Sequence, residues 1–592
     1  MRRPFAHQVS TKVIRRRRAR PAVRWLQAAL TLLALQGCLA TAAECAKGAT
    51  IPNLGRFYSD AWGIDVRSTR FQPAGRTSIN ATNVARLRLK WVYGLSTQAP
   101  RSYPLVTPDT IFIGDGAQIV ALDRTSGCTR WTYAGAGLRG GQVSSAILHD
   151  ARGGRATLYF VERSGGVFAL NAADGKLLWT HPPPGDNPIP MLSGTPLLHD
   201  GVLFVPLSSI EVVLASNPFY GCCTTSGGMA ALDARTGAER WYRRTIPTLP
   251  KVTGRHFWFV AEHGPSGAPV WGAPTLDTAR GTLYFGTGQN YSRPATNTSD
   301  AIFAVNAADG AVRWVRQFSI AGQFSTAGQG DAYNTSCDLS QGHPNCPKPM
   351  GPDLDFGAPP VLSRTPDGRE LLLVAQKSGD VYALNPADGA LVWRNRVGRG
   401  GALGGVHWGI AVDEAQGLVF VPISDIEAGQ LNRKGEQRPG LFALDIVTGA
   451  MRWSHLRKAR CADRVCSAGL SAAIVAAPGV VFAGGLDGKL EAVDSRAGRL
   501  LWTYDSWRDY QTTVNGTPAK GGAFDAHGPL LADDLLIVSS GYGSFFQRGG
   551  NALLVFQLQP PAPAPVQPQP KAQPQPQAQP QPQAQPQLPV QR

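Results

Sequence analysis

The sequence predicts an all-β protein, an eight-bladed β-propeller that spans residues 44–558. One reason is a phrase that occurs seven times and joins a β-rich run, a turn with Asp or Asn and Gly, and a closing Trp. A second reason is the set of strand-like runs between these phrases, for example at 157–161, 202–206 and 418–422. A third is the content of 67 glycines and 46 prolines, which favours turns and short strands over long helices.

Each occurrence of the repeated phrase is expected to mark one blade. Its Asp, Asn and Gly residues supply positive φ angles and local side-chain capping at the turn. Consecutive closing tryptophans lie between 48 and 79 residues apart, which fits four strands with loop insertions. The runs alternate with period two, which favours strands over a solenoid of amphipathic helices. The seven phrases end at Trp131, Trp179, Trp241, Trp314, Trp393, Trp453 and Trp502.

The two ends of this region are expected to close the ring. Trp91, in RLRLKWVYG, stands where an eighth closing Trp would stand, without the preceding turn. The segment 551–558 (NALLVFQL) can pair with N-terminal strands, and such closure removes sheet edges that would otherwise aggregate. Residues 559–592 alternate Pro with Gln, a composition that cannot bury a core. We expect a disordered tail there.

Residues 1–43 have the order of a secretory signal peptide. Nine cations and no acid precede Leu26, an apolar run follows at 25–35, and small residues end at 42–43. The apolar run is too short to span a bilayer. We therefore expect export to the periplasm, with two outcomes open. Either the leader is cleaved after the small residues, or Cys38 in a lipobox-like LQGC segment is lipidated and attaches the chain to a membrane.

The net charge of +17 at pH 7 does not indicate a nucleic-acid partner. Nine of these charges lie in the leader and two in the tail, so the body of the chain is mildly basic, near +6. The sequence also has no GxGxxG in a βαβ context, no phosphate-binding loop, no zinc-ligand spacing and no GxSxG elbow. These patterns give no support to nicotinamide, nucleotide or zinc chemistry.

The cysteines indicate disulfides, because eight of them remain after Cys38 in a chain expected to be exported. Cys222 and Cys223 are adjacent; they form an eight-membered disulfide ring, which we favour, or stay as two separate thiols. No CxxCH occurs, so no covalent c-type haem is expected in this chain. The expected pairs are Cys45–Cys128, Cys222–Cys223, Cys337–Cys346 and Cys461–Cys466.

The repeated phrase resembles the tryptophan-docking motif of quinoprotein alcohol dehydrogenases, which bind pyrroloquinoline quinone (PQQ) at the centre of an eight-bladed propeller. The resemblance covers nearly the whole body and is greatest to the polyvinyl-alcohol dehydrogenases. The segments that resemble them most are WGIDVRSTRFQPA (62–74), VPLSSIEV (205–212), GCC (221–223), DLDFGAPPVL (353–362), GGVHWGIAVD (404–413) and TVNGTPAKGGAFDAHGP (513–529).

A quinone site needs a flat aromatic floor, a lid, a divalent cation and a base that takes the alcohol proton as hydride leaves. The resemblance implies that Trp271 is the floor, since it precedes Gln289 by 18 residues as in the family. It implies that the adjacent cysteines form the lid over the other face. Asp355 in DLDFGAP aligns with the catalytic base, and Asp353 is the alternative.

The same resemblance implies a calcium site with hard oxygen ligands. Glu211 stands at the position of the family's calcium-binding carboxylate, and Asp355 is the second acidic ligand. Gln289 departs from the family, which commonly reads GTGN where this chain reads GTGQN, and Asn290 is the alternative. Gly357 stands where lanthanide-using relatives have an extra Asp, which favours calcium.

Further residues match contacts to PQQ. Lys377 matches a cation that hydrogen-bonds the quinone oxygens, and Arg139 a partner for a PQQ carboxylate. Ser193 and Ser208 match polar contacts, and Trp408, which follows His407, matches a signature near the ring centre. Packing at the ring centre is the alternative explanation of that last pair.

We therefore expect a periplasmic PQQ- and calcium-dependent alcohol dehydrogenase. It would oxidise primary or secondary alcohols, including polymeric ones, and pass electrons to a separate cytochrome c, soluble or membrane-bound. The alternatives are a non-catalytic propeller that serves as an outer-membrane assembly scaffold, and a quinoprotein that has lost turnover. The joint occurrence of Glu211, Trp271, Asp355 and Lys377 favours the enzyme, because a scaffold does not need these residues.

Overall fold

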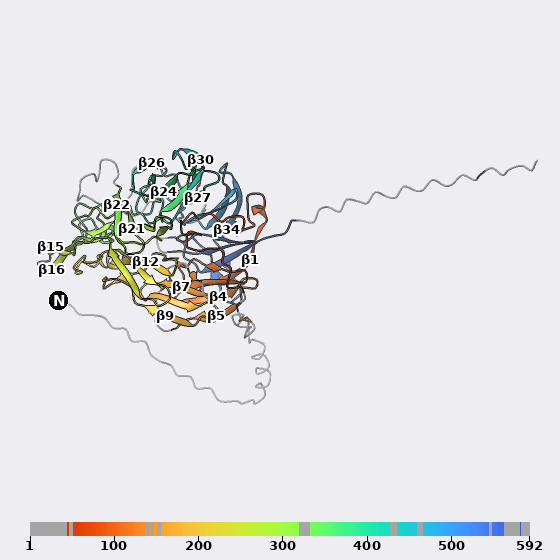
Figure 1. Cartoon of the computed structure of the whole chain (residues 1–592), viewed down its shortest axis with the longest axis horizontal. Helices are drawn as coiled ribbons and strands as arrows, with labels where there is room; N and C mark the ends of the chain where they lie inside the picture. The colour runs from red at the N-terminus through yellow and green to blue at the C-terminus, as the bar shows by residue number, and fades with distance from the viewer. Residues whose placement is uncertain are drawn as a thin grey trace, which may run out of the picture.

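Eight antiparallel sheets follow one another around a ring in the computed structural model of the chain (Figure 1). The structure describes residues 44–45, 51, 53–135, 142–143, 147–150, 156–318, 332–426, 435–458, 466–543, 547–561 and 581. Residues 1–43 and nearly all of the Pro/Gln-rich tail lie outside the described residues, as does Arg139. The prediction of an all-β, eight-bladed propeller is confirmed.

Seven blades are built from consecutive stretches of chain, and the closing Trp of each phrase lies in the blade's last strand. The first three contain β2 (Leu105–Val106), β3 (Thr110–Asp115), β4 (Gln118–Asp123) and β5 (Thr129–Tyr133); β6 (Leu148–Asp150), β7 (Thr157–Glu162), β8 (Gly166–Asn171) and β9 (Leu177–His181); and β11 (Leu197–His199), β12 (Val202–Ser209), β13 (Gly228–Asp233) and β14 (Glu239–Arg244), with β10 (Pro190–Met191) also paired to β12.

The next four blades repeat this order. They contain β18 (Thr275–Asp277), β19 (Thr282–Gly286), β21 (Ala301–Asn306) and β22 (Val312–Gln317); β23 (Val361–Arg364), β24 (Glu370–Ala375), β25 (Asp380–Leu384) and β26 (Leu391–Arg396); β27 (Ala411–Asp413), β28 (Leu418–Ile423), β29 (Gly440–Asp445) and β30 (Met451–Leu456); and β31 (Val475–Ala477), β32 (Val480–Gly484), β33 (Lys489–Asp494) and β34 (Leu500–Asp505).

The eighth blade joins the two ends of the propeller. Its strands are β37 (Leu530–Ala532), β38 (Leu535–Ser540), β39 (Ala552–Leu558) and β1 (Leu87–Gly94). Strand β1 runs antiparallel to β39, with Leu87 opposite Leu558 and Gly94 opposite Ala552. The prediction that 551–558 closes the ring against an N-terminal strand is confirmed, and the closing sheet contributes the buried residues of β37–β39 to the largest apolar cluster.

Seven of the eight closing tryptophans dock on the turn of the next blade. The Trp241 indole donates from Nε1 to the Ala307 carbonyl at 3.1 Å, and a Cβ on Gly310 would lie 2.6 Å from the indole ring. Gly310 also has φ +70°, so the turn needs glycine for two reasons. Equivalent indole–carbonyl bonds join Trp91 to Arg124, Trp131 to Ala172, Trp179 to Ala234, Trp314 to Pro386, Trp393 to Ile446 and Trp453 to Ser495.

The interface that closes the ring differs from the others. Trp502 contacts the ring of Phe556 in β39 edge to face, with centroids 5.5 Å apart. The repeated turn is missing from the eighth blade, as the sequence indicated for the segment around Trp91. An aromatic contact therefore replaces the indole-on-glycine contact at this interface.

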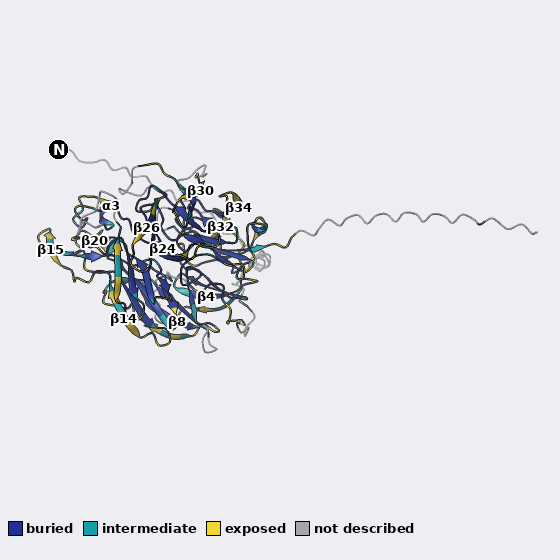
Figure 2. Cartoon of the chain, turned by 45° about the horizontal axis from the view of Figure 1, so that its top comes forward, coloured by how far each residue is buried: buried dark blue, intermediate teal, exposed yellow. Residues whose placement is uncertain are grey.

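Several inserts leave the blades between their regular strands. They are α2 (Glu211–Leu214), the hairpin of β15 (Lys251–His256) and β16 (Val260–Gly264), the pair β17 (Ser266–Gly267) and β20 (Asn290–Ser292), α3 (Ser336–Leu339), and the pair β35 (Asp509–Tyr510) and β36 (Ala519–Lys520). Most blade strands are buried, whereas the β15 hairpin is largely exposed (Figure 2). None of the described helices is both long and apolar enough to span a bilayer.

Three of the four expected disulfides are present, namely Cys45–Cys128, Cys222–Cys223 and Cys337–Cys346. Cys466 is also disulfide-bonded, while Cys461, its expected partner, lies outside the described residues. The adjacent cysteines therefore form the ring disulfide that the sequence favoured.

Replacing Gly310 with Ala tests the docking contact. We expect a loss of about 1–3 kcal/mol in the free energy of unfolding, because the Cβ adds a clash with Trp241 to the cost of a left-handed backbone. Urea unfolding followed by tryptophan fluorescence measures it. Gly281→Ala is the matched control, since Gly281 has φ +58° with no atom within 4 Å of the added Cβ. Equal losses in the two variants would contradict the docking contribution.

Candidate active site at the centre of the propeller

Asp355 lies at the meeting point of three inserts and is 4% exposed. Its Oδ1 accepts the backbone N–H of Gln289 at 2.9 Å. Its Oδ2 accepts from Trp271 Nε1 at 2.9 Å and from Lys377 Nζ at 2.9 Å. Asp355 precedes β23, Lys377 lies in the turn between β24 and β25, and the other two residues flank β18 and β19. The structure thus brings together four residues that the sequence proposed for one site.

Lys377 is a buried cation between two carboxyl groups. Its Nζ lies 3.1 Å from Asp353 Oδ1 and 2.9 Å from Asp355 Oδ2, and 5.4 Å from the centroid of the Trp271 ring. Burial alone would lower the pKa of Lys377, but the negative charges of Asp353 and Asp355 outweigh it and raise this pKa above its ordinary value. The ammonium therefore keeps its proton at all physiological pH values.

Two glycines make room for this arrangement. A Cβ on Gly357 would lie 1.8 Å from Cη2 of Trp271, so the indole lies directly against the backbone there. A Cβ on Gly288 would lie 2.8 Å from Asp355 Oδ1. An aspartate at position 357 would therefore displace the Trp271 ring, which gives a steric reason for the glycine that the sequence shows there.

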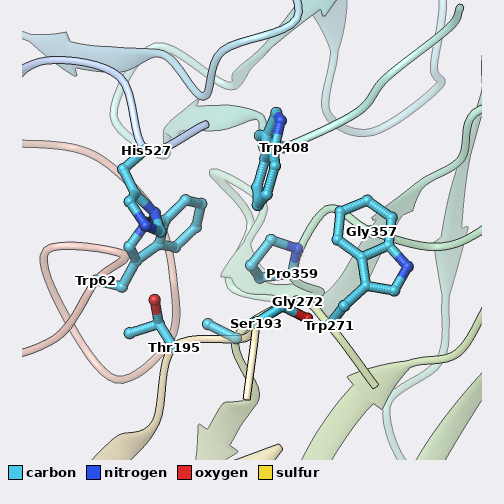
Figure 3. Close-up of a pocket in the computed structure, with 10 residues that line it drawn as sticks. Trp62, Ser193, Thr195, Trp271, Gly272, Gly357, Pro359, Trp408 and His527 are labelled. Carbon is cyan, nitrogen blue, oxygen red and sulfur yellow. Dashed lines mark hydrogen bonds between the residues drawn. The ribbon is translucent and has the colours of Figure 1, made fainter. Parts of the chain in front are cut away.

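A narrow aromatic-walled cavity of about 10 Å³, room for about one water molecule, adjoins Asp355's neighbour Trp271 (Figure 3). Trp62, Trp271 and Trp408 line it together with His527 and polar side chains of Ser193 and Thr195. The rings of Trp271 and Trp408 meet nearly at right angles, with centroids 5.3 Å apart. The Ser193 hydroxyl is buried and has no hydrogen-bond partner in the structure, so it is available to a ligand. The flat walls and this hydroxyl have the chemistry to contact a planar polar ring system, but these side chains would have to move apart to admit one.

The cavity contains two residues to which the sequence assigned no role, Trp62 and His527. Trp62 Nε1 donates to His527 Nδ1 at 2.7 Å, so a neutral His527 has its proton on Nε2. The guanidinium of Arg70, 4.4 Å from the Trp62 ring, bonds the backbone carbonyls of both residues. Both lie in segments that resemble the family, but they are 465 positions apart, and no spacing rule joins residues across a closed ring.

Further ionisable groups surround Trp408. The Arg101 guanidinium lies 5.9 Å from the Trp408 ring and 5.2 Å from the Tyr542 ring. Burial, and then the neighbouring Arg101, lower the pKa of Arg163. Burial raises the pKa of Asp525 to about 6, against opposing hydrogen bonds and the charge of Arg101. Arg101 is thus a described cation beside Trp408, with Arg163 close enough to interact with it, and the sequence-based candidate Arg139 lies outside the described residues.

Glu211 begins α2 and is completely buried. Its Oε1 accepts from the Tyr220 hydroxyl at 2.8 Å and the Thr224 N–H at 2.7 Å. Its Oε2 accepts from the Thr225 N–H at 2.7 Å and the Thr225 hydroxyl at 2.5 Å. These donors occupy both oxygens, so Glu211 fixes the loop that contains Cys222 and Cys223.

The Cys222–Cys223 disulfide packs with Tyr291 and does not line the aromatic cavity. The two cysteines and Tyr291 form one buried apolar cluster. Burial raises the pKa of Tyr291, opposed by a hydrogen bond with Ser208, and the charges of Asp355, Glu211 and Asp353 raise it further. Tyr291 thus packs with the disulfide, lies within the electrostatic influence of these carboxylates and bonds Ser208. The role of the disulfide as a lid over PQQ stays a prediction.

The donor set fits a hard cation in part. Gln289 Oε1 is buried with no hydrogen-bond partner, as expected of an oxygen that awaits a ligand. Glu211 presents no free oxygen, because the loop donors use both. Within the part of the chain that the structure describes, no three His, Cys, Asp or Glu side chains form a metal-binding group. Calcium binding by Glu211 would require its loop bonds to be exchanged.

Comparisons with known proteins agree with this geometry. The family model described as glucose/ethanol/alcohol dehydrogenase, β-propeller domain, matches residues 60–322, and that of outer membrane protein assembly factor BamB matches residues 350–557. The polyvinylalcohol dehydrogenase of Sphingopyxis sp. is 34% identical over 88% of this chain and 78% of its own length. That of a Pseudomonas sp. is 33% identical over 84% of this chain and 76% of its own.

The solved structures agree on the fold. The quinohemoprotein alcohol dehydrogenase from Comamonas testosteroni superposes with a TM-score of 0.60 at 18% identity, over 86% of this chain and 82% of that one. At this identity the likeness shows a shared propeller architecture and nothing finer.

Asp525 gives a test of the electrostatics beside the cavity. Because burial raises its pKa from 3.8 to about 6, the folded protein is most stabilised below pH 4 and loses this contribution as pH rises through 6. Relative to Asp525→Asn, the wild type should lose about 3 kcal/mol between pH 4 and pH 8. Urea unfolding of both proteins across this range measures the difference. Parallel pH profiles would contradict the raised pKa.

Proposed function

The chain belongs to the PQQ-dependent quinoprotein alcohol dehydrogenases, and from this premise we propose that it oxidises primary or secondary alcohols, including polymeric alcohols of the polyvinyl-alcohol type. It is an oxidoreductase of that family. The observation that supports the proposal best is the Asp355 carboxylate, buried and bonded by Trp271, Lys377 and the Gln289 backbone at 2.9 Å each. A carboxylate so placed is suited to accept a proton.

The aromatic cavity is the proposed binding site for PQQ. Trp271 would lie against the quinone ring, with Trp408 and the Ser193 hydroxyl as further contacts. The Lys377 ammonium and Ser208 would bond its oxygens, and the adjacent Cys222 and Cys223 would lie toward its other face, as in the sequence-based assignment. Arg139 is the proposed partner of a PQQ carboxylate. When bound, PQQ supplies the acceptor for the hydride that leaves the alcohol carbon.

Asp355 is the proposed general base. The proton of the substrate hydroxyl would pass to its carboxylate as the hydride leaves the same carbon atom. Lys377 and Trp271 both donate to Oδ2, which orients the carboxylate before the substrate arrives. The buried surroundings exclude water from the group, which is 4% exposed.

Calcium is the proposed metal, with Gln289, Asp355 and Glu211 as ligands. The unpartnered Gln289 Oε1 supports this assignment. Glu211 is the weaker part of the set, since its oxygens already accept four short hydrogen bonds from residues 220–225. We assign no proton or hydride step to the metal.

The proposed acceptor of the electrons is a separate cytochrome c, because the sequence has no CxxCH for a haem of its own. The leader-like residues 1–43 support a periplasmic location, with or without a lipid on Cys38. The match of residues 350–557 to the assembly-factor model favours a scaffold as the second candidate function. Asp353, Asp355 and Lys377 lie in that same segment, and a scaffold has no use for a buried cluster of charges.

Asp355→Asn tests the base. We expect dye-linked alcohol oxidation to fall by at least about 10²-fold, because Asn cannot accept the proton, while PQQ stays bound. Titration of the apo-protein with PQQ and calcium, read by absorbance and then by dye reduction with a panel of alcohols, measures both. Asp353→Asn is the matched control and should keep most of its turnover. If Asp355→Asn keeps its activity and Asp353→Asn loses it, the base is Asp353.

Gln289→Ala tests the metal site. Loss of the free amide oxygen should weaken calcium binding and, with it, the retention of PQQ on gel filtration. Glu211→Ala should weaken both too, because it removes a proposed ligand and the anchor of the loop at 220–225. Asn515→Ala is a control, since it removes a buried amide that bonds the backbone of Gly94 in β1, away from the loop at 220–225. Unchanged calcium affinity in Gln289→Ala would remove Gln289 from the site.

A further inference from the structure

The β15–β16 hairpin ends in an exposed aromatic tip, which we define as Phe219, Phe257, Trp258 and Phe259. Their side chains are 66%, 46%, 87% and 52% exposed, respectively. Among the described residues, every exposed Phe or Trp belongs to this tip. The hairpin projects from the rim of the propeller at the left of Figures 1 and 2, clear of the blades. Such a concentration of exposed apolar surface marks an interaction site.

The four rings form one continuous apolar surface. The Phe219 ring lies 5.6 Å from that of Phe257 and 6.5 Å from that of Phe259, and the Trp258 ring lies 5.3 Å from that of Phe259. Phe219 comes from the loop after α2, and His256 Nε2 contacts the carbonyl of the adjacent Pro218 at 2.7 Å. The tip is therefore fixed to the insert beside it.

The backbone of the tip adopts a conformation that is unfavourable for bulky residues. Phe257 and Trp258, in the loop that joins the two strands, have φ angles of +45° and +57°. Bulky side chains rarely adopt this left-handed conformation, and Gly, Asn or Asp normally occupy such positions. These rings bury little surface against the described residues, so their packing there does not offset the cost of the left-handed backbone. This cost indicates that the rings become buried against a partner.

The charges around the tip identify the partner. Lys251 and Arg255 are exposed on β15. The only acid in 216–225 and 246–264 is Glu262, which lies 3.2 Å from His256 Nδ1 and faces the hairpin itself. The tip is thus an exposed apolar surface with Arg255 beside it and Lys251 at the other end of β15, opposite Gly264. That pattern is complementary to a surface of anionic phosphates above a hydrocarbon layer, where Trp and Phe rings bind favourably.

We propose that the aromatic tip inserts into the interfacial layer of an anionic lipid bilayer, with Lys251 and Arg255 on lipid phosphates. This attachment is independent of any lipid on Cys38. The tip is also joined to the active-site loop, because the β16 residue His263 exchanges backbone hydrogen bonds with Cys222 and Cys223. The membrane contact and the proposed catalytic centre therefore belong to one connected insert.

Co-sedimentation with lipid vesicles tests the proposal. The full chain with Cys38→Ser, which cannot be lipidated there, is mixed with phosphatidylglycerol–phosphatidylethanolamine vesicles or with phosphatidylcholine vesicles. We expect binding to the anionic vesicles that weakens as salt rises. Trp258→Ser with Phe257→Ser should lower the partition coefficient by about tenfold or more. Lys251→Glu with Arg255→Glu should lower it too and abolish its salt dependence.

Leu391→Ser with Val392→Ser is the matched control, since these side chains are 50% and 40% exposed on β26, away from the hairpin. It should bind as the parent does. Thermal unfolding checks that each variant is folded; Trp258→Ser alone, at a side chain 87% exposed, replaces the double variant if that one unfolds. The proposal is overturned if the Cys38→Ser chain does not bind anionic vesicles. It is equally overturned if the tip variants have the same partition coefficient as that chain. It is also overturned if the tip variants lose only self-association, cytochrome c binding or binding of a polymeric alcohol.

Discussion

The rest of the structure depends on the contact of a closing indole with the turn glycine of the next blade, which seven of the eight blade interfaces make. It fixes the angle and distance between blades at the outer edge, as the Trp241–Gly310 contact illustrates. Because the ring closes, a change at one interface must be absorbed by the others. Pairing of β1 with β39 completes the ring and brings the inserts of separate blades to the same centre.

The centre concentrates buried charge, which a propeller does not need for stability. Lys377 between Asp353 and Asp355 has to be desolvated, and replacing such a cluster with apolar side chains often leaves stability unchanged or higher. Its position beside Trp271 and an aromatic cavity gives it a chemical use instead. The buried oxygen of Gln289, without a partner, is a second polar group whose cost folding alone does not offset.

The inserts serve the centre and the surface together. Glu211 bonds the loop of Cys222 and Cys223, that loop bonds β16, and β16 leads to the exposed Trp258. Sequence resemblance identified Glu211 as a metal ligand, and the structure shows that its oxygens already serve the loop. A motif match names a residue type at a position, but its hydrogen-bond partners depend on where the chain folds back. The exposed tip had no counterpart in any motif, because FWF reads as one more apolar strand segment.

The sequence by itself determined the blades, since the turn glycines and closing tryptophans are local signals that recur with a regular spacing. It also proposed Trp271, Gln289, Asp355 and Lys377 for one site, because they lie in recognisable segments, and the structure brings these four together. Only the tertiary structure decided which side chains meet. The Trp62–His527 bond spans 465 positions, and the Tyr291 ring packs with the Cys222–Cys223 disulfide. Such contacts depend on ring closure, which places residues by blade geometry and not by their separation along the chain.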